Sequence, residues 1–177
     1  MNNSNGFDQF QKGDWFVIWT ESRAEKQVEA RIAALGLPSW LPTIKERHRW
    51  SDRWREVVCP LFPGYLFARA TESWHQLLRI PGVLSIVKRD GEPAVVPAEL
   101  VNQLREVIHG AGIPAERVAD PPAYQPGDEV IVQEGALKGV RGVVRERRSG
   151  RQLVIWVAEI GRGVAFTIGN ALVKAAP

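Results

Sequence analysis

The side chains that could perform covalent or metal chemistry are few and scattered in this sequence. The three histidines, His48, His75 and His109, and the single cysteine, Cys59, do not share the short spacings that bind a metal ion. Cys59 precedes Pro60, and a thiol acts as a nucleophile only when a base lies beside it, which the sequence does not supply. These residues predict neither a catalytic centre nor a metal site.

The glycine-rich segments that could bind phosphate also lack the required patterns. Gly135–Gly139 contains a lysine but not the Gly-Lys-Ser/Thr ending of a phosphate loop, and Gly161–Gly163 lacks the third glycine of a dinucleotide-binding fingerprint. We interpret these glycines as turn residues that adopt positive φ. The sequence therefore predicts a protein that is not an enzyme and needs no cofactor.

The composition indicates a soluble, cytoplasmic protein with one or two compact domains. A chain of 177 residues can bury a core, and a lone cysteine excludes a disulfide framework. The longest apolar run, Leu153–Ala158, is far shorter than the roughly 20 residues of a membrane span. The net charge of +3 is small, but cations concentrate between Lys45 and Arg55 and between Arg141 and Arg151.

A segment rich in proline and glycine, residues 110–124, divides the chain. It has neither a helical nor a strand period, so it predicts a flexible linker. The linker would separate an N-terminal domain, residues 14–109, from a C-terminal domain, residues 125–177. Residues 1–13 are predicted to form a disordered tail.

The N-terminal domain begins with a predicted strand and helix. Trp15–Trp19 is apolar throughout, which is typical of a strand buried on both faces. Ser22 and Glu25 have the spacing of a capping box at a helix start, and Gly36 is placed to end that helix. The predicted apolar face of the helix consists of Ala24, Val28, Ile32 and Leu35.

The rest of this domain mixes strands and helices without a strict β-α repeat. Trp40–Trp50 and Trp54–Val58 predict a hairpin around residues 51–53, Trp74–Ile80 a second helix, and the residues after Pro97 a third helix. Short strands are predicted at 84–88 and 94–96. We expect an α+β sandwich with a mainly antiparallel sheet and three helices.

The C-terminal domain is predicted to be entirely β. Its β-branched runs are Val130–Val132, Val140–Val144, Leu153–Val157 and Val164–Ile168, with glycines between them. This pattern favours a small barrel of roughly five strands. The same glycines disfavour helices, at about 1 kcal/mol each relative to alanine.

The segment Pro60–Phe67 carries more aromatic rings than a strand of this length needs for its core. In a strand, Tyr65 and Phe67 share one face and Leu66 lies on the other. At least one apolar face must be covered, either by the core or by a partner protein. The segment alone leaves both alternatives open.

Motifs in both halves resemble one known family. Five segments of the first half resemble, in order and spacing, the N-terminal (NGN) domain of NusG-family transcription elongation factors. They are Trp15–Ile18, the helix beginning at Ser22, Leu61–Phe67, Trp74–Val83 and Pro93–Pro97. Residues 127–135 followed by 138–144 resemble a KOW motif, which implies an SH3-like barrel.

The resemblance implies how the N-terminal domain would bind RNA polymerase. Members of the family dock through an apolar depression onto the clamp helices of the polymerase. The matching residues here are Trp19, Tyr65, Phe67, Val101 and Leu104, with Arg89 where related antiterminators carry an aromatic residue. A contact with the opposite polymerase lobe is implied for Trp74, His75 and Gln76.

Further contacts are implied for nucleic acid and for a second partner. Antiterminators read the non-template DNA strand from the first helix, at positions matching Lys26, Gln27 and Arg31. Acidic residues interrupt these cations, so a solvated helix face fits equally well. The KOW domain would bind a small-subunit ribosomal protein or Rho through Leu137, Ile160 and Arg162. We expect a monomer without a membrane partner.

The branch of the family is predicted from the hairpin. Arg47–Arg53 leading to Pro60–Tyr65 resembles the specialised antiterminators of the RfaH and UpxY type, which implies suppression of pausing or termination. Gly161–Arg162 is shared with housekeeping NusG, which remains the first alternative. The second alternative is a ribosome-associated or RNA-binding KOW protein, with its site at Arg141, Arg145, Arg147 and Arg148.

Overall fold

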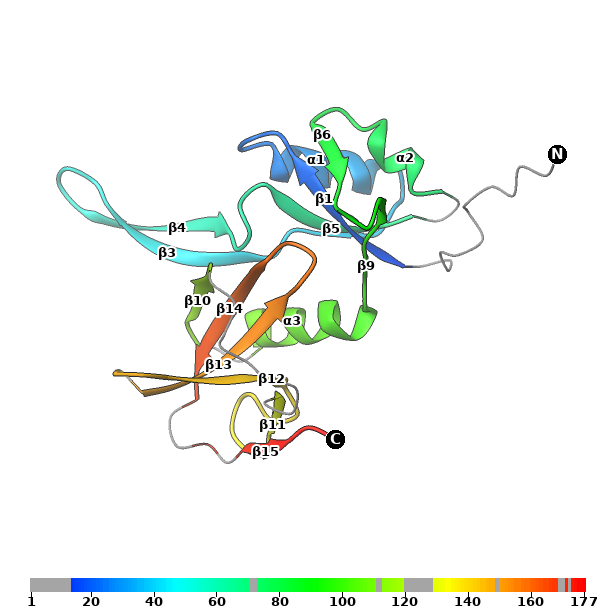
Figure 1. The fold of residues 1–177 in the computed structure, drawn as a ribbon. Coiled ribbons are helices and arrows are strands. Elements are labelled where there is room, and N and C mark those ends of the chain that lie inside the picture. The colour runs from blue at the N-terminus through cyan, green and yellow to red at the C-terminus, as the bar shows by residue number, and fades with distance from the viewer. Residues whose placement is uncertain are drawn as a thin grey trace. The chain divides into compact units, whose positions relative to one another are not determined.

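The computed structural model describes residues 14–70, 73–110, 113–119, 129–148, 150–168, 171 and 173–177 (Figure 1). The chain divides into two compact units. The first unit consists of Met1–Leu41 and Pro63–Ala98. The second unit consists of Pro42–Phe62 and Glu99–Pro177. None of the helices in the described part of the chain is long and apolar enough to cross a membrane.

The first unit contains a five-stranded antiparallel sheet with the order β2-β5-β1-β6, and β9 also pairs with β1. Its strands are β1 (Trp15–Thr20), β2 (Ser39–Trp40), β5 (Tyr65–Arg69), β6 (Val83–Ile86) and β9 (Val95–Val96). A separate short hairpin pairs β7 (Lys88–Arg89) with β8 (Glu92–Pro93). The mainly antiparallel sheet predicted from the sequence is confirmed.

The helices α1 (Glu25–Ala34) and α2 (His75–Leu78) cover one face of this sheet (Figure 1). Val28 and Ile32 of α1 and Leu77 of α2 pack with strand residues that include Ile18 and Leu66. Trp15 and Val17, on the opposite face of β1, are buried as well. The prediction of a strand buried on both faces is therefore confirmed for Trp15–Ile18, whereas Trp19 is 48% exposed.

The two ends of α1 differ in how well local sequence predicts them. Gly36 follows the helix with φ of +72°, as expected of a glycine that ends a helix. The predicted capping box is wrong, because Ala24 occupies the N-cap without a side-chain hydrogen bond. Leu35, predicted on the buried face, is exposed at the C-cap.

The second unit contains a β-ribbon, a helix and a sheet. The ribbon pairs β3 (Thr43–Arg49) with β4 (Trp54–Pro60), as the hairpin prediction required, and the helix is α3 (Ala98–Gly110). The six-stranded antiparallel sheet has the order β10-β14-β13-β12-β11-β15. Its strands are β10 (Ala115–Val118), β11 (Glu129–Val132), β12 (Arg141–Arg147), β13 (Gly150–Val157), β14 (Arg162–Thr167) and β15 (Val173–Ala175).

The C-terminal sheet confirms the all-β prediction for this part of the chain. Two of its strands, β10 and β15, were not predicted. β10 falls inside the segment expected to be a linker and pairs with β14 from Ala115↔Phe166 to Val118↔Gly163. The domain boundaries drawn around that linker stay a prediction.

Two glycines of this sheet, Gly142 and Gly163, do not serve as turn residues. Gly135, Gly139, Gly150 and Gly161 do adopt positive φ. Gly142 does not, and a Cβ there would lie 2.6 Å from the carbonyl oxygen of Val154. A Cβ on Gly163 would lie 2.8 Å from the Trp156 ring. Both glycines allow close contact between neighbouring strands rather than a turn.

Substitution of Gly142 by alanine should destabilise the C-terminal sheet. The added methyl group overlaps a backbone oxygen that cannot move without disturbing the β12–β13 pairing. We expect Gly142→Ala to lower the free energy of unfolding by about 1–3 kcal/mol in urea denaturation. Gly110→Ala, at a position with no heavy atom within 4 Å, is the control. Equal stability of the two variants would contradict the close-contact role.

Candidate functional site

The register between β1 and β5 decides which side chains reach each face of the first sheet. Ile18 lies opposite Leu66, and Trp19 lies opposite Tyr65. Because alternate residues point to opposite faces, Ile18 and Leu66 join the core under the helices. Trp19 and Tyr65 emerge together on the other face. Trp19 is 48% exposed and Tyr65 is half-buried.

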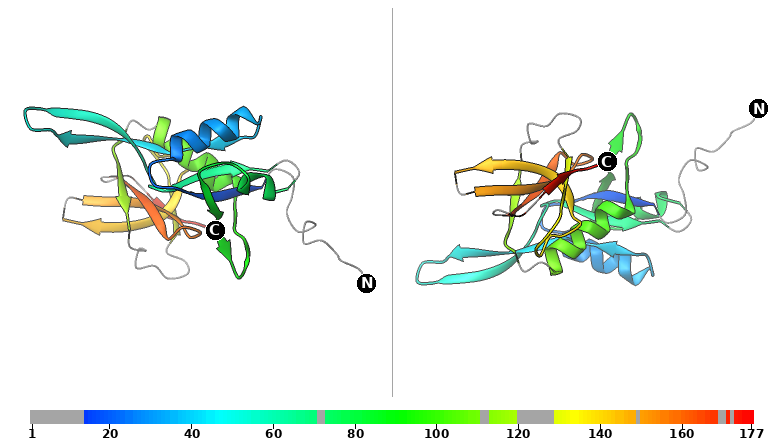
Figure 2. Two further views of the ribbon diagram at one scale, coloured as in Figure 1. Left: turned by 90° about the horizontal axis from the view of Figure 1, so that it is seen from above. Right: turned by 90° about the horizontal axis from the view of Figure 1, so that it is seen from below.

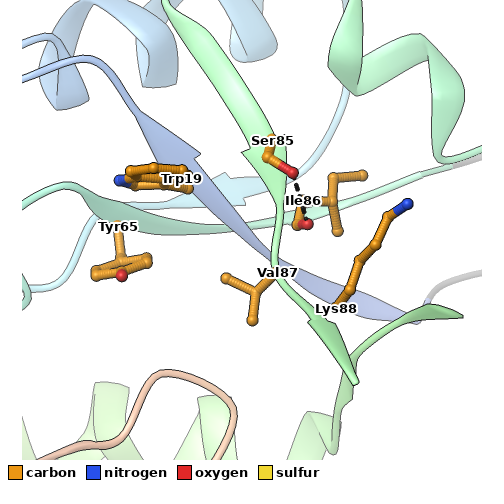
Figure 3. A pocket seen from close by; sticks show the side chains of 6 residues that line it. All are labelled: Trp19, Tyr65, Ser85, Ile86, Val87 and Lys88. Carbon is orange, nitrogen blue, oxygen red and sulfur yellow. Dashed lines mark hydrogen bonds between the residues drawn. The ribbon is translucent and has the colours of Figure 1, made fainter. Parts of the chain in front are cut away.

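These two aromatic side chains line a pocket with a volume of about 230 Å³ (Figure 3). Its other residues come from one continuous segment, Ser85–Lys88, which follows from β6 into β7. The Ser85 hydroxyl is directed back to its own chain, where it donates to the carbonyl oxygen of Ile86 at 2.9 Å. Lys88 is the one charged residue that lines the pocket, and its ammonium group extends away from the Trp19 and Tyr65 rings (Figure 3).

The turn that leads into Tyr65 is fixed by two elements. Gly64 has φ of +84°, and its amide donates to a carboxylate oxygen of Glu25 at 2.7 Å. Its carbonyl accepts hydrogen bonds from the amide of Thr20, at 2.9 Å, and from the Thr20 hydroxyl, at 3.3 Å. Glu25 is only 6% exposed, so this bond is shielded from water. The start of α1 and the end of β1 thus hold the edge of the pocket.

The pocket offers binding chemistry rather than catalysis. Its residues are two aromatic rings, aliphatic side chains, a hydroxyl already donating within the chain and one lysine. A partly exposed tryptophan beside a tyrosine is typical of a surface that a partner protein covers. The lysine favours a partner that carries acidic groups at the edge of its apolar surface.

The other residues predicted for the docking surface are buried. Phe67 is fully buried and stacks on Trp40 with ring centroids 5.6 Å apart. Val101 and Leu104 are fully buried on α3, in the second unit. None of the three lines the Trp19–Tyr65 pocket. Their assignment to the docking surface stays a prediction.

The residues predicted to contact the second polymerase lobe gather at the start of α2. Trp74 packs against the core of the first unit, and its ring stacks on His75 with centroids 3.6 Å apart. The His75 ring lies within hydrogen-bond distance of the Ser73 hydroxyl, at 3.1 Å. His75 is exposed and Gln76 half-buried, so this turn presents one accessible polar ring.

The residues predicted to read DNA, Lys26, Gln27 and Arg31, are all exposed on α1. Arg31 also donates to the carbonyl oxygen of Pro81 at 2.6 Å and so ties the helix to the turn before β6. Because the Arg31 guanidinium already makes this hydrogen bond, fewer of its N–H groups are available to a DNA phosphate.

The residues predicted for the KOW partner site differ in exposure. Leu137 is buried, Ile160 is half-buried and Arg162 is exposed. Ile160 lies in the turn between β13 and β14, and Arg162 is the first residue of β14. Of these three residues, only Ile160 and Arg162 have side-chain surface that a partner could contact.

Sequence reasoning missed the Ser85–Lys88 wall of the pocket. The segment was predicted as a short strand, and only the pairing of Trp19 with Ser85 places it beside the aromatic residues. Arg89, predicted at the rim, lies just beyond the wall, in β7 opposite Glu92. The sequence pattern gave no signal for this wall, because Ile86 is buried while Leu84 in the same strand is 51% exposed.

A group of potential ligands on the ribbon was also missed. Ligand atoms of Glu46, His48 and Cys59 lie within 4.8 Å of one another, although no metal-binding spacing is present in the sequence. His48 Nε2 lies 3.2 Å from a Glu46 oxygen and 3.9 Å from Cys59 Sγ. The other Glu46 oxygen pairs with Arg117, and Arg55 lies opposite His48. Because the Arg117 guanidinium already pairs with Glu46, we interpret this group as a hydrogen-bonded cluster.

Removal of the Glu25 carboxylate should loosen the edge of the pocket. Glu25→Ala leaves the Gly64 amide without its partner, which we expect to cost about 1–3 kcal/mol in the free energy of unfolding. The Gly64 amide proton should also exchange faster with solvent. Thermal unfolding and hydrogen exchange measure the two effects. Glu21→Ala, at an exposed position, is the control, and equal effects of both substitutions would contradict the role of Glu25.

Comparisons with known proteins identify the family. The family described as "NusG: Transcription termination factor nusG" matches residues 13–105. The transcription termination/antitermination protein NusG of Rickettsia felis is 22% identical over 173 residues, covering 90% of this chain and 88% of that protein.

Solved structures of similar chains cover nearly the whole sequence. One, described as "Domain interaction in Thermotoga maritima NusG", is 18% identical, covers 93% of each chain and has a TM-score of 0.46. Another, "Crystal Structure of MjSpt4:Spt5 complex conformation A", is 17% identical, covers 92% of this chain and 99% of that chain, and has a TM-score of 0.30. Because the family match spans more than half of the residues, this chain belongs to the NusG family of transcription factors.

Proposed function

We propose that this NusG-family transcription factor docks onto the clamp helices of RNA polymerase through the Trp19–Tyr65 pocket and suppresses pausing or termination. It acts by binding and not by catalysis. The observation that carries the proposal is the pairing of Trp19 with Tyr65, which brings an exposed and a half-buried aromatic ring to one pocket.

A protein helix fits this pocket better than a small polar ligand. The aromatic rings supply apolar area that a partner can cover, and Lys88 supplies one charge at the side. Aromatic residues that a partner buries fully are frequent hot spots, each worth about 2 kcal/mol or more. The pocket is small, so the partner contributes a ridge of side chains rather than a deeply inserted group.

The effect on elongation follows from differential binding. A factor that binds the closed, actively elongating polymerase better than the paused one shifts the equilibrium toward elongation, by about tenfold for each 1.4 kcal/mol of difference. The turn at Trp74, His75 and Gln76 is proposed as the contact with the opposite polymerase lobe. Contacts with both lobes would make the factor sensitive to their separation.

The C-terminal sheet is proposed to recruit a second partner, a small-subunit ribosomal protein or Rho. Ile160 and Arg162 at the β13–β14 turn would form the contact, whereas Leu137 is buried in the free chain. The C-terminal sheet is covalently connected to the domain that is proposed to bind polymerase. This connection would raise the effective concentration of the second partner at the transcription complex.

The ribosome-associated or RNA-binding alternative depends on cations that are partly used within the fold. Arg145 donates to Gln152 at 2.7 Å, and Gln152 donates to Glu116 at 2.8 Å. Arg145 therefore serves a network between strands β10, β12 and β13, which weakens a site built on it. The housekeeping alternative keeps the same docking pocket and differs only in the effect on termination.

Substitution of either pocket ring should weaken polymerase binding without unfolding the protein. We expect Trp19→Ala or Tyr65→Ala to raise the Kd for core RNA polymerase by about 30-fold, from the loss of roughly 2 kcal/mol of contact. Biolayer interferometry measures the affinity, and thermal unfolding monitors the fold. Leu35→Ala removes an exposed apolar residue away from the pocket and is the matched control. Unchanged binding by folded pocket variants would overturn the docking proposal.

The effect on termination separates the two branches of the family. In a reconstituted elongation assay with Rho, we expect the protein to reduce pausing or Rho-dependent termination, because its hairpin resembles that of the specialised antiterminators. Tyr65→Ala should abolish the effect and serves as the internal control. Enhanced Rho-dependent termination would instead support the housekeeping alternative.

A further inference from the structure

We propose that the β3–β4 ribbon is a binding surface for single-stranded nucleic acid, with Trp50 and Trp54 as stacking platforms and arginines as phosphate contacts. This surface shares no residue with the polymerase-docking pocket. The proposal goes beyond the proposed function and is tested on the free protein. In Figure 2, β3 and β4 run side by side as a two-stranded ribbon closed by a turn.

One face of the ribbon carries an arginine stacked on Trp54. Arg49 lies directly opposite Trp54, and Arg47 lies two residues earlier on the same face. The guanidinium carbon of Arg47 is 5.8 Å from the centre of the Trp54 ring, within the range of a cation–π contact. This face therefore carries Arg47 and Arg49 with one indole, next to the Lys45–Glu56 ion pair.

The opposite face repeats the arrangement with Trp50. Arg55 lies opposite His48, and its guanidinium carbon is 5.3 Å from the centre of the Trp50 ring. The Trp50 amide donates to the carbonyl oxygen of Arg53 at 2.9 Å, which closes the turn and fixes the backbone that carries this indole. Each face of the ribbon thus presents one tryptophan held beside an arginine.

Both indoles are too exposed to act as core residues. Trp50 is 57% and Trp54 is 59% exposed, and these are among the most exposed large apolar side chains of the described residues. Exposed tryptophans beside arginines are the combination with which proteins bind unpaired bases, because every base has a flat face that stacks on an indole. The guanidinium groups would hold the indole rings in place. They would also lie close to a nucleic-acid strand whose bases stack on those rings.

The charges of the ribbon leave three arginines available for phosphates. Its carboxylates are already paired: Lys45 with Glu56 at 2.8 Å, Arg53 with Asp52 at 3.4 Å, and Arg117 with Glu46. The hydrogen bond to Glu56 raises the pKa of Lys45 above its ordinary value. Within the described residues, no carboxylate pairs with Arg47, Arg49 or Arg55, and all three are exposed.

The combination favours a single strand over a duplex. In a duplex the bases are stacked on one another, and only phosphates and groove edges are accessible. Arginines alone would be enough to bind the phosphates of a duplex. The two exposed indoles would then have no unpaired base to stack on. Unpaired bases reach an indole on either face while the phosphates between them contact arginines.

The first test measures binding of fluorescein-labelled oligonucleotides to the free full-length protein by anisotropy. The probes are a single strand of roughly 15 nucleotides, as DNA and as RNA, and the duplex of the same sequence. We expect the single strands to bind more tightly than the duplex. The double variant Trp50→Ala/Trp54→Ala should weaken single-strand binding by about tenfold or more, whereas Trp50→Phe/Trp54→Phe should retain most of it. A preference for DNA or RNA identifies the natural strand, and either preference supports the site.

The second test measures the salt dependence of the same binding. Arg47→Gln/Arg49→Gln/Arg55→Gln removes three phosphate contacts, so the slope of log K against log salt should become less steep by about 2. The charge-matched control is Arg79→Gln/Lys138→Gln/Lys174→Gln, which removes three exposed cations that lie outside the ribbon and outside the other predicted nucleic-acid sites. Thermal unfolding of every variant confirms that it is folded.

The outcomes separate a specific ribbon site from general attraction between charges. Loss of affinity in the ribbon variants together with near-normal affinity in the control supports the proposal. Equal losses in the ribbon and control arginine variants, or an affinity that does not change when both tryptophans are replaced by alanine, would overturn it. Loss of polymerase binding in Trp19→Ala with oligonucleotide binding intact would show that the two surfaces act independently.

Discussion

The functional features of the first unit depend on the register in which β1 pairs with β5. With Ile18 opposite Leu66, the helices α1 and α2 cover a continuous apolar face, and with Trp19 opposite Tyr65 the two rings meet on the other side. A shift by one residue would move every side chain to the opposite face. The hydrogen bonds of Gly64 with Thr20 and Glu25 connect the end of β1 to the start of β5, so the turn and the register support each other.

The sequence predicts best those elements that are determined by nearby residues. Gly36 ends α1 because a positive φ is needed there, and the β3–β4 ribbon forms around a short polar turn. Long-range partners overturned two local predictions. Glu25 has the spacing of a capping box but bonds to Gly64, which is 39 residues away in sequence. Ala115–Val118 lacks any strand period but becomes β10 because the edge of β14 offers it hydrogen-bond partners.

The same distinction applies to the candidate site. Alternation along a strand predicted that Tyr65 and Phe67 share a face, and this is correct. Alternation does not predict how far each is covered: Phe67 is buried and stacked on Trp40, whereas Tyr65 reaches the pocket. The wall formed by Ser85–Lys88 could not be predicted either, because the order of strands in a sheet is decided by tertiary packing and not by the pattern within one strand.

The ribbon has a second consequence, which concerns solubility. β3 and β4 pair only with each other among the described strands, so both outer edges carry backbone groups that another strand could bind. Exposed apolar side chains on Trp50, Trp54 and Val58 would strengthen such pairing between molecules. The arginines along both strands oppose it, because two copies brought edge to edge would place like charges together. The cations of the ribbon thus also keep separate molecules apart.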